Sequence, residues 1–136
     1  MKDTSLDKQL QKDLKDLIAE LVEIAPSSDR DRVWRYLEKI YEARRALEKH
    51  SGPSLGRVLN SIAKTLNRRF DKNVARLLIE MSVPSSTSSK MKRKYSDSVN
   101  LAYRKKISVR SFVQFVSDQG GLNGCVAEYA RIKRGR

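Results

Sequence analysis

The feature that most constrains the fold is the spacing of apolar residues, which recur at intervals of three or four through most of the chain. In the first segment these positions are Leu6, Leu10, Leu14, Leu17, Leu21 and Ile24. Residues at such intervals share one face of an α-helix, whereas the alternation at every second residue that is typical of a half-buried strand is nowhere sustained. The sequence therefore predicts an all-α protein, a compact bundle of about five to seven short helices with no sheet.

Residues that commonly cap or break helices indicate where the further helices begin. In chain order they are Ser28, Ser54, Asp71, Ser96, Ser108 and Asn123. Side chains of these types accept hydrogen bonds from the first free N–H groups of a helix. Gly120 and Gly121 precede the last of these starts, and glycine readily adopts the left-handed conformation that ends a helix.

The stretch from Pro84 to Ser89 contains four serines and one threonine, a composition typical of a loop. We therefore expect three parts: a helical core region over residues 1–83, a Ser-rich basic linker over 84–95, and a basic C-terminal helical region over 96–136. The last part either packs on the core or is appended to it. A length of 136 residues suits one domain, since single domains span about 100 to 200 residues.

The charge of the chain is strongly positive and unevenly distributed. There are 29 Lys and Arg against 16 Asp and Glu, a net charge of +13. Residues 1–25 carry 4 basic and 6 acidic side chains, whereas residues 90–136 carry 12 basic and 3 acidic ones. A one-sided basic block attracts polyanions and gains from counterion release, so we expect nucleic acid, DNA or RNA, as the partner.

Composition excludes several classes of protein. One cysteine, Cys125, and one histidine, His50, cannot form an internal disulfide or a four-ligand zinc site. We expect Cys125 to be a small core residue, with a reactive thiol as the alternative, and His50 to lie at a helix end. No catalytic constellation or phosphate-binding glycine loop is recognisable. The sequence therefore predicts no enzyme, no cofactor and no metal.

No apolar run is long enough to span a membrane, and the first residues do not form a signal peptide. We expect an intracellular, cytoplasmic protein without a membrane partner, associated with the nucleoid in a bacterium or located in the nucleus in a eukaryote.

Candidate phosphate contacts fall into four groups along the chain. They are Lys90, Lys92, Arg93 and Lys94 after the serines; Arg104, Lys105, Lys106 and Arg110 around a predicted corner between two helices; Arg131, Lys133 and Arg134 near the end; and Arg57, Arg68, Arg69 and Arg76 in the middle helices. Lysine and arginine contact phosphates without reading sequence. The alternatives are a solubilising arm or a nuclear import signal for the first group and a solvated helix face for the last. Tyr95 and Tyr103 belong to the core or stack on bases.

Residues 108–134 have the outline of a helix-turn-helix, with the second helix entering the major groove through residues 123–128. The small or apolar side chains at 124–127 offer almost nothing to base edges. A plain helical hairpin is the alternative.

The segment Ser54, Leu55, Gly56, Arg57, Val58, Leu59, followed by Arg76, Leu77 and Leu78, resembles the small helical subunit of Cascade-type CRISPR effector complexes. This resemblance implies a compact, basic, all-helical protein that stacks along such a complex and supports bound nucleic-acid strands, with groove residues at Arg57 and Arg76. The C-terminal third departs from the family.

The sequence thus predicts a non-catalytic nucleic-acid-binding protein that grips the phosphate backbone through its basic C-terminal region, as a component of a nucleoprotein complex. Two alternatives remain: a helical adaptor that binds protein partners or itself through the N-terminal leucine stripe, and a helix-turn-helix DNA-binding regulator.

Overall fold

The computed structural model of the chain describes residues 4–25, 30–47, 53–65 and 73–135, and within these ranges it contains helices and no strand. The elements are α1 (Thr4–Ile24), α2 (Arg30–Leu47), α3 (Pro53–Lys64), α4 (Val74–Ser82), α5 (Ser89–Arg104), the short 3₁₀ helix η1 (Val109–Ser111), α6 (Phe112–Asp118) and α7 (Gly121–Arg134). The prediction of an all-α bundle without a sheet is confirmed.

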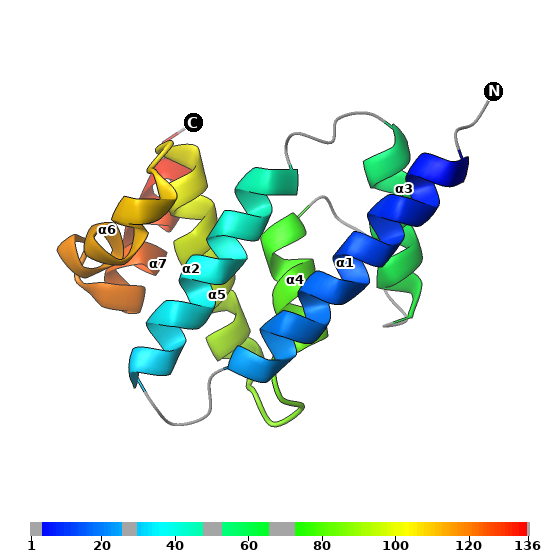
Figure 1. The fold of residues 1–136 in the computed structure, drawn as a ribbon. Coiled ribbons are helices and arrows are strands. Elements are labelled where there is room, and N and C mark those ends of the chain that lie inside the picture. Colours follow the sequence, from blue (N-terminus) through cyan, green and yellow to red (C-terminus); the bar gives the residue numbers. More distant parts are fainter. Residues whose placement is uncertain (1–3, 26–29, 48–52, 66–72, 136) are drawn as a thin grey trace.

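Helices α1 and α3 lie at one end of the molecule and α6 and α7 at the other (Figure 1). Helix α1 packs against α2, α3 and α4, while α5 packs against α2, α4 and most extensively against α7. Helices α2, α4 and α5 therefore form the middle of the bundle. Helices α6 and α7 pack on α5, and together these basic C-terminal helices make up the end of the bundle that we call the α5–α7 end.

One hydrophobic core runs through the whole bundle. Fully buried side chains come from each of the helices α1 to α7, and they include Leu21, Ile40, Leu59, Ile79, Val99, Phe112 and Cys125. The basic C-terminal region therefore packs on the core, which was one of the two arrangements expected for it. The leucine stripe of α1 is part of the same core, since Leu10, Leu14 and Leu21 are buried.

The expected linker over residues 84–95 is shorter in the structure. Helix α5 begins at Ser89, and the Oγ of Ser88 caps it by accepting a hydrogen bond from the Met91 N–H at 3.1 Å. The basic residues 90–94 are therefore helical, and Ser96, expected to be the cap, is buried within α5. Tyr95, which lies within this helix, is buried edge-on against Tyr36, with ring centroids 6.1 Å apart.

Other helix starts also differ from the expectations. Asn73 caps α4 through a hydrogen bond from the Arg76 N–H to its Oδ1 at 3.0 Å, whereas Asp71 and Ser28 lie outside the described residues. Helix α7 begins at Gly121, ahead of Asn123. The glycine prediction is confirmed, because Gly120 and Gly121 have φ angles of 95° and 80°.

Helix α2 holds the corner between α5 and η1 in place. The Tyr41 hydroxyl donates to the backbone carbonyls of Ile107 and Ala102, and Arg45 Nη1 donates to the Ile107 carbonyl at 2.7 Å. The Tyr41 ring also stacks on Phe112, with centroids 5.0 Å apart. These contacts fix the C-terminal end of α5, where several candidate residues lie.

Candidate nucleic-acid interface

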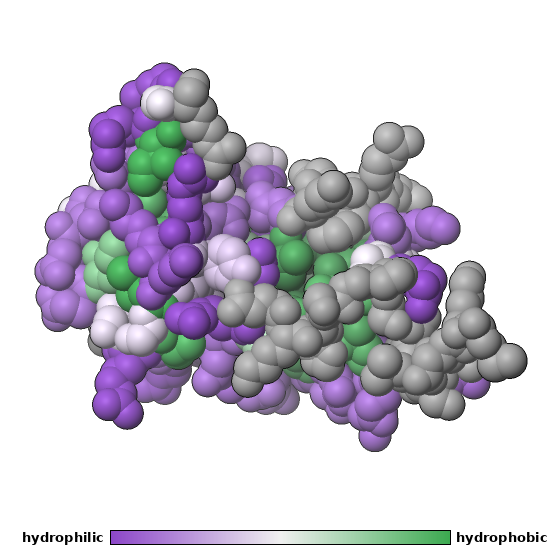
Figure 2. Space-filling view, turned by 90° about the horizontal axis from the view of Figure 1, so that it is seen from above, coloured by the Kyte–Doolittle hydropathy of each residue, from purple (hydrophilic) through white to green (hydrophobic). Residues whose placement is uncertain are grey.

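Exposed cations gather at the α5–α7 end of the molecule. Their side chains are those of Lys90, Arg93, Arg104, Lys105, Lys106, Arg110, Arg131, Lys133 and Arg134. Hydrophilic residues cover much of this end in the view from above (Figure 2). Helix α1 also exposes lysines, but exposed acidic residues such as Asp13, Asp16 and Glu20 are interleaved with them. Cations outnumber carboxylates at the α5–α7 end, so we expect a positive potential there.

Two of the predicted phosphate contacts are instead bound within the protein. Glu80, whose side chain is only 8% exposed, accepts from Arg76 Nε at 3.1 Å and from Lys92 Nζ at 2.8 Å. The partners' side chains are 24% and 21% exposed. This ion-paired group joins α4 to α5, so Arg76 and Lys92 contribute to packing and share one negative charge between them.

Three other candidates share carboxylates at the surface. Glu128 on α7 pairs with Arg131 at 2.7 Å and with Lys105 at 3.8 Å, which ties α7 to the end of α5. The hydrogen bond from Arg131, together with the charges of Arg131 and Lys105, lowers the pKa of Glu128, although desolvation opposes this effect. Arg93 lies 3.6 Å from Asp97. All three cations stay exposed and present part of their charge to solvent.

A polar cavity of about 410 Å³ lies where α2, α4, α5 and α7 meet. Its lining residues are Arg44, Asn73, Val74, Asn100, Tyr103, Arg104 and Tyr129. We refer to it as the Arg44–Arg104 cavity. Asn100 Nδ2 donates to Asn73 Oδ1 at 3.2 Å, and that oxygen also accepts the Arg76 N–H that caps α4. The side-chain amides of Asn73 and Asn100 are therefore positioned by the N-terminus of α4.

Each of the two aromatic rings of this cavity has a cation above it. The Arg44 guanidinium carbon lies 3.8 Å from the Tyr103 ring centroid, and Lys133 Nζ lies 4.6 Å from the Tyr129 centroid. Both distances are within the range for cation–π attraction. Stacking on Tyr103 restricts the Arg44 side chain, so its positive charge is held at the cavity rather than sampling many rotamers.

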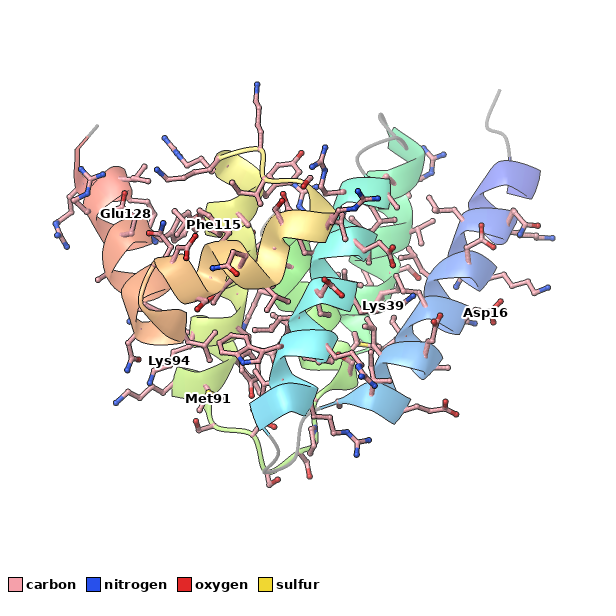
Figure 3. All side chains as sticks on the ribbon, turned by 60° about the vertical axis from the view of Figure 1, so that its left-hand side comes forward. Asp16, Lys39, Met91, Lys94, Phe115 and Glu128 are labelled. Atoms are coloured by element: carbon pink, nitrogen blue, oxygen red, sulfur yellow. The ribbon has the colours of Figure 1, made fainter. Side chains whose placement is uncertain are left out.

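The remaining candidates are spread over the surface. Lys90 and Lys94 lie near the start of α5, and Figure 3 shows Lys94 on the same end of the molecule as Glu128 of α7. Arg57 is half-buried on α3, which lies on the far side of the molecule from α7 (Figure 1). Arg57, one of the candidate cations of the middle helices, therefore lies apart from the C-terminal cations. Arg68, Arg69 and His50 lie outside the described residues.

Sequence reasoning missed four of the cavity residues: Arg44, Asn73, Asn100 and Tyr129. Arg44 lies on a predicted helix beside core residues, and only the fold brings it to Tyr103. Tyr95 and Tyr103, which were considered together, separate in the structure. Tyr95 is buried in the core, whereas Tyr103 is half-buried and lines the cavity.

Two buried ionisable groups belong to the packing of α5 and α7. Burial raises the pKa of Asp97, although the nearby charges of Lys133, Arg93 and Arg76 oppose this effect. Cys125 is fully buried, and its burial raises the pKa of the thiol, opposed by a hydrogen bond with Ser98. Because the thiolate is the reactive form of cysteine, this confirms Cys125 as a core residue and disfavours a reactive thiol.

The geometry of α6 and α7 favours a helical hairpin over a base-reading helix. Within residues 123–128 of α7, Cys125 is buried and the carboxylate of Glu128 is paired with cations, which leaves Asn123 as the one exposed polar side chain. A Cβ atom on Gly124 would lie 1.7 Å from the Gln119 carbonyl oxygen, so glycine here permits the close approach of α6 and α7.

Comparison with protein-family models, with curated proteins and with solved structures finds no match. The resemblance to the small Cascade-type subunit therefore stays a prediction. In the part of the chain that the structure describes, no helix is long and apolar enough to cross a membrane. Across the same residues, no three His, Cys, Asp or Glu side chains are grouped as metal ligands would be.

Proposed function

We propose that the protein is a non-catalytic nucleic-acid-binding protein that grips phosphates through the α5–α7 end, as a component of a nucleoprotein complex. The observation that carries this proposal is the gathering of exposed cations at one end of the bundle, around a cavity that is itself lined by arginines. The cations expected to contact phosphates are Lys90, Lys94, Arg104, Lys106, Arg110, Lys133 and Arg134, with Arg93, Lys105 and Arg131 sharing their charge with carboxylates.

The size of the surface suits several phosphates. Helix α5 has 16 residues and is therefore about 24 Å long. One strand of B-form DNA places a phosphate about every 3.4 Å, so this length corresponds to about seven phosphates. Lys90 and Lys94 lie near one end of this span and Arg104 at the other. Because residues 95–99 between them are buried, α5 itself contacts phosphates at its two ends.

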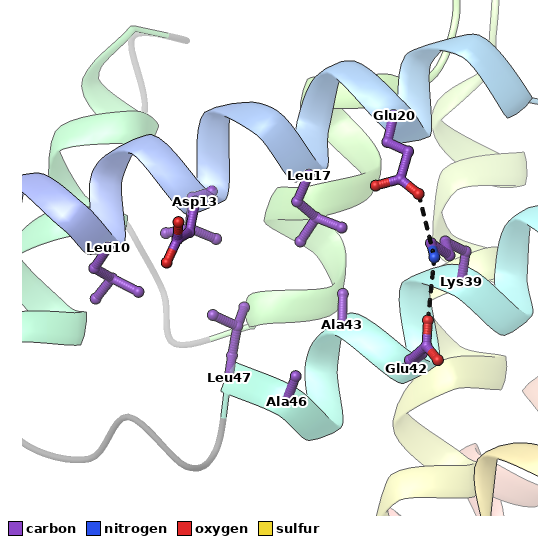
Figure 4. Close-up of a pocket in the computed structure, with 10 residues that line it drawn as sticks. Leu10, Asp13, Leu17, Glu20, Lys39, Glu42, Ala43, Ala46 and Leu47 are labelled. Carbon is purple, nitrogen blue, oxygen red and sulfur yellow. Dashed lines mark ion pairs between the residues drawn. The ribbon is translucent and has the colours of Figure 1, made fainter.

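One hollow toward the opposite end of the molecule is unsuited to a polyanion. Between α1 and α2 lies a hollow of about 430 Å³ with a largely apolar lining that includes Leu10, Leu17 and Leu47 (Figure 4). The carboxylates of Glu20 and Glu42 at this hollow share Lys39 at 3.2 and 3.3 Å. Two carboxylates against one ammonium leave this region without surplus positive charge, so nucleic acid is expected to approach from the α5–α7 side.

The adaptor alternative loses its main support in the structure. The leucine stripe proposed to pair with another helix is already used within the bundle, because Leu10, Leu14 and Leu21 are buried against the protein's own core. A partner helix would have to displace that packing.

Two triple variants of equal charge change test the proposal. In the first, Lys106, Arg110 and Arg134 are replaced by Gln; in the matched control, Lys8, Lys12 and Lys15 of α1 are replaced by Gln. All six side chains are exposed. Binding to labelled DNA and RNA oligonucleotides is measured by fluorescence anisotropy at fixed salt. We expect the first variant to bind about tenfold more weakly and the control less than about threefold. Equal losses would contradict the assignment of the α5–α7 end.

A further inference from the structure

We propose that the Arg44–Arg104 cavity receives one unstacked nucleotide of the bound nucleic acid, with the base inside the cavity and a phosphate at its arginines. This inference rests on the proposed function and adds to it a binding site and a preference for single-stranded nucleic acid. It explains why a hollow with this particular lining lies within the cationic surface.

The size of the cavity suits a nucleotide better than a phosphate alone. Sites for small molecules and cofactors have volumes of about 300 to 1,000 Å³, and the cavity of about 410 Å³ falls within this range. A phosphate on a flat cationic surface needs no hollow. The volume leaves room for a larger group beside the phosphate, and in a nucleic acid that group is the sugar and base.

The lining supplies partners for each part of a nucleotide. Arg44 and Arg104 carry guanidinium groups that bind phosphate through several N–H donors. Tyr103 and Tyr129 contribute aromatic rings, and bases stack on such rings without regard to sequence. Because Arg44 and Lys133 cover one face of each ring, a base must stack on the other face or displace the cation. The hydrogen bond to Asn73 uses one N–H of Asn100 and leaves a second N–H and a carbonyl oxygen to hydrogen-bond the polar edge of a base.

The cavity is also ordered before the ligand arrives. Arg44 is stacked on Tyr103, Lys133 on Tyr129, and the two asparagines are joined to each other at the start of α4. Side chains that are already restricted lose less entropy on binding, which favours a specific contact over a loose electrostatic one.

A cavity that receives a base favours single-stranded over double-stranded nucleic acid. In a regular duplex every base is stacked and paired, so none can enter a cavity in a protein surface without being extruded at a cost of a few kcal/mol. A single strand presents unstacked bases without that cost. We therefore expect the protein to bind single strands more tightly than duplexes of the same length.

A matched pair of single variants separates this cavity from general charge attraction. Arg104→Gln and Arg110→Gln each remove one exposed arginine, but only Arg104 lines the cavity. For a 20-nucleotide single strand we expect Arg104→Gln to raise Kd about tenfold and Arg110→Gln no more than about threefold, whereas both should affect duplex binding equally. Equal effects on the single strand would overturn the cavity proposal while leaving the proposed function intact.

The aromatic contribution is tested at Tyr129. Tyr129→Phe keeps the ring and should bind a single strand as the wild type does, whereas Tyr129→Leu should bind at least about fivefold more weakly because stacking is lost. Circular dichroism and thermal unfolding of both variants verify folding. A leucine variant that is folded and binds normally, or a phenylalanine variant that binds as poorly as the leucine one, would contradict base stacking on this ring.

Small probes identify the group that the cavity recognises. In NMR titrations of the full chain, a nucleoside 5′-monophosphate should shift the amide signals of Asn100 and Arg104 at lower concentration than inorganic phosphate does, and a single strand at lower concentration still. Phosphate acting as well as the nucleotide would show an anion site only. A free nucleotide bound more tightly than the single strand would assign the cavity to a metabolite. Absence of binding to any nucleic acid would refute the proposed function together with this inference.

Discussion

The carboxylate of Glu80 offers a sharp test of how α4 is joined to α5. Its two oxygens accept from Arg76 at 3.1 Å and from Lys92 at 2.8 Å, and it is 8% exposed. In Glu80→Gln one oxygen remains as an acceptor, but the other is replaced by an NH₂ group that donates hydrogen bonds. One of the two cations must then face a donor and lose its partner.

The expected loss of stability follows from the burial of this group. A hydrogen bond to a charged group contributes about 1.5 to 3 kcal/mol when it is well shielded from water. The side chains of Arg76 and Lys92 are 24% and 21% exposed, so water compensates part of the loss. We expect the free energy of unfolding to fall by about 1 to 2 kcal/mol. With an unfolding entropy of about 2.1 cal/mol/K per residue, this lowers Tm by about 3 to 7 °C.

Glu42→Gln provides the matched control, because the same chemical change is made at a carboxylate that is 55% exposed and paired with Lys39. Exposed ion pairs contribute little, so this variant should stay within about 0.5 kcal/mol of the wild type. Both variants are compared by urea unfolding followed by circular dichroism. If Glu80→Gln is as stable as Glu42→Gln, the ion-paired group does not hold α4 to α5 and the reasoning is wrong.

Three further substitutions test the core and the buried charge. Phe112→Ala removes a fully buried ring stacked on Tyr41 and should lower the free energy of unfolding by about 3 to 5 kcal/mol, measured by urea unfolding; a loss below 1 kcal/mol would contradict this packing. Gly124→Ala forces a Cβ to within 1.7 Å of the Gln119 carbonyl and should cost about 3 kcal/mol, seen as a lower Tm; an unchanged Tm would refute the close approach. The raised pKa of Asp97 means that the folded protein holds this proton more tightly than the unfolded chain does, so its stabilising effect is present below the unfolded value of about 3.9 and is lost as the pH rises through the folded value. Asp97→Asn should therefore show a smaller fall in stability between pH 4 and pH 7 than the wild type; parallel profiles would show that its pKa is not raised.

The helical architecture was predictable because it follows from local periodicity. The leucines of α1 repeat at helical spacing, and Leu10, Leu14 and Leu21 are buried as that spacing requires. Gly120 and Gly121 were predictable for a similar reason, since few other residues adopt positive φ angles readily.

The start of α5 could not be predicted from local chemistry, because Ser88 and Ser96 are equally able to cap a helix. In the structure Ser88 caps α5, and Tyr95 within the helix is buried against Tyr36 of α2. Such a contact between distant segments leaves no trace in the spacing of residues around either serine.

The candidate site was predictable in its charge and not in its geometry. The excess of lysine and arginine after residue 90 marks the basic end directly. The contact of Arg44 with Tyr103 and the binding of Lys92 by Glu80 instead depend on how α2, α4 and α5 pack. Sequence alone therefore could not tell which cations face solvent and which hold helices together.

The salt dependence of binding tests the central claim, that the α5–α7 end grips phosphates, most directly. The Kd of the wild-type protein for a single-stranded oligonucleotide is measured between 50 and 300 mM salt, a range of about sixfold. If five or more phosphates are neutralised, log Kd should rise with log salt concentration with a slope of at least about 3.5, at about 0.7 per phosphate for a single strand. A slope near zero, or no binding at the lowest salt, would contradict the account.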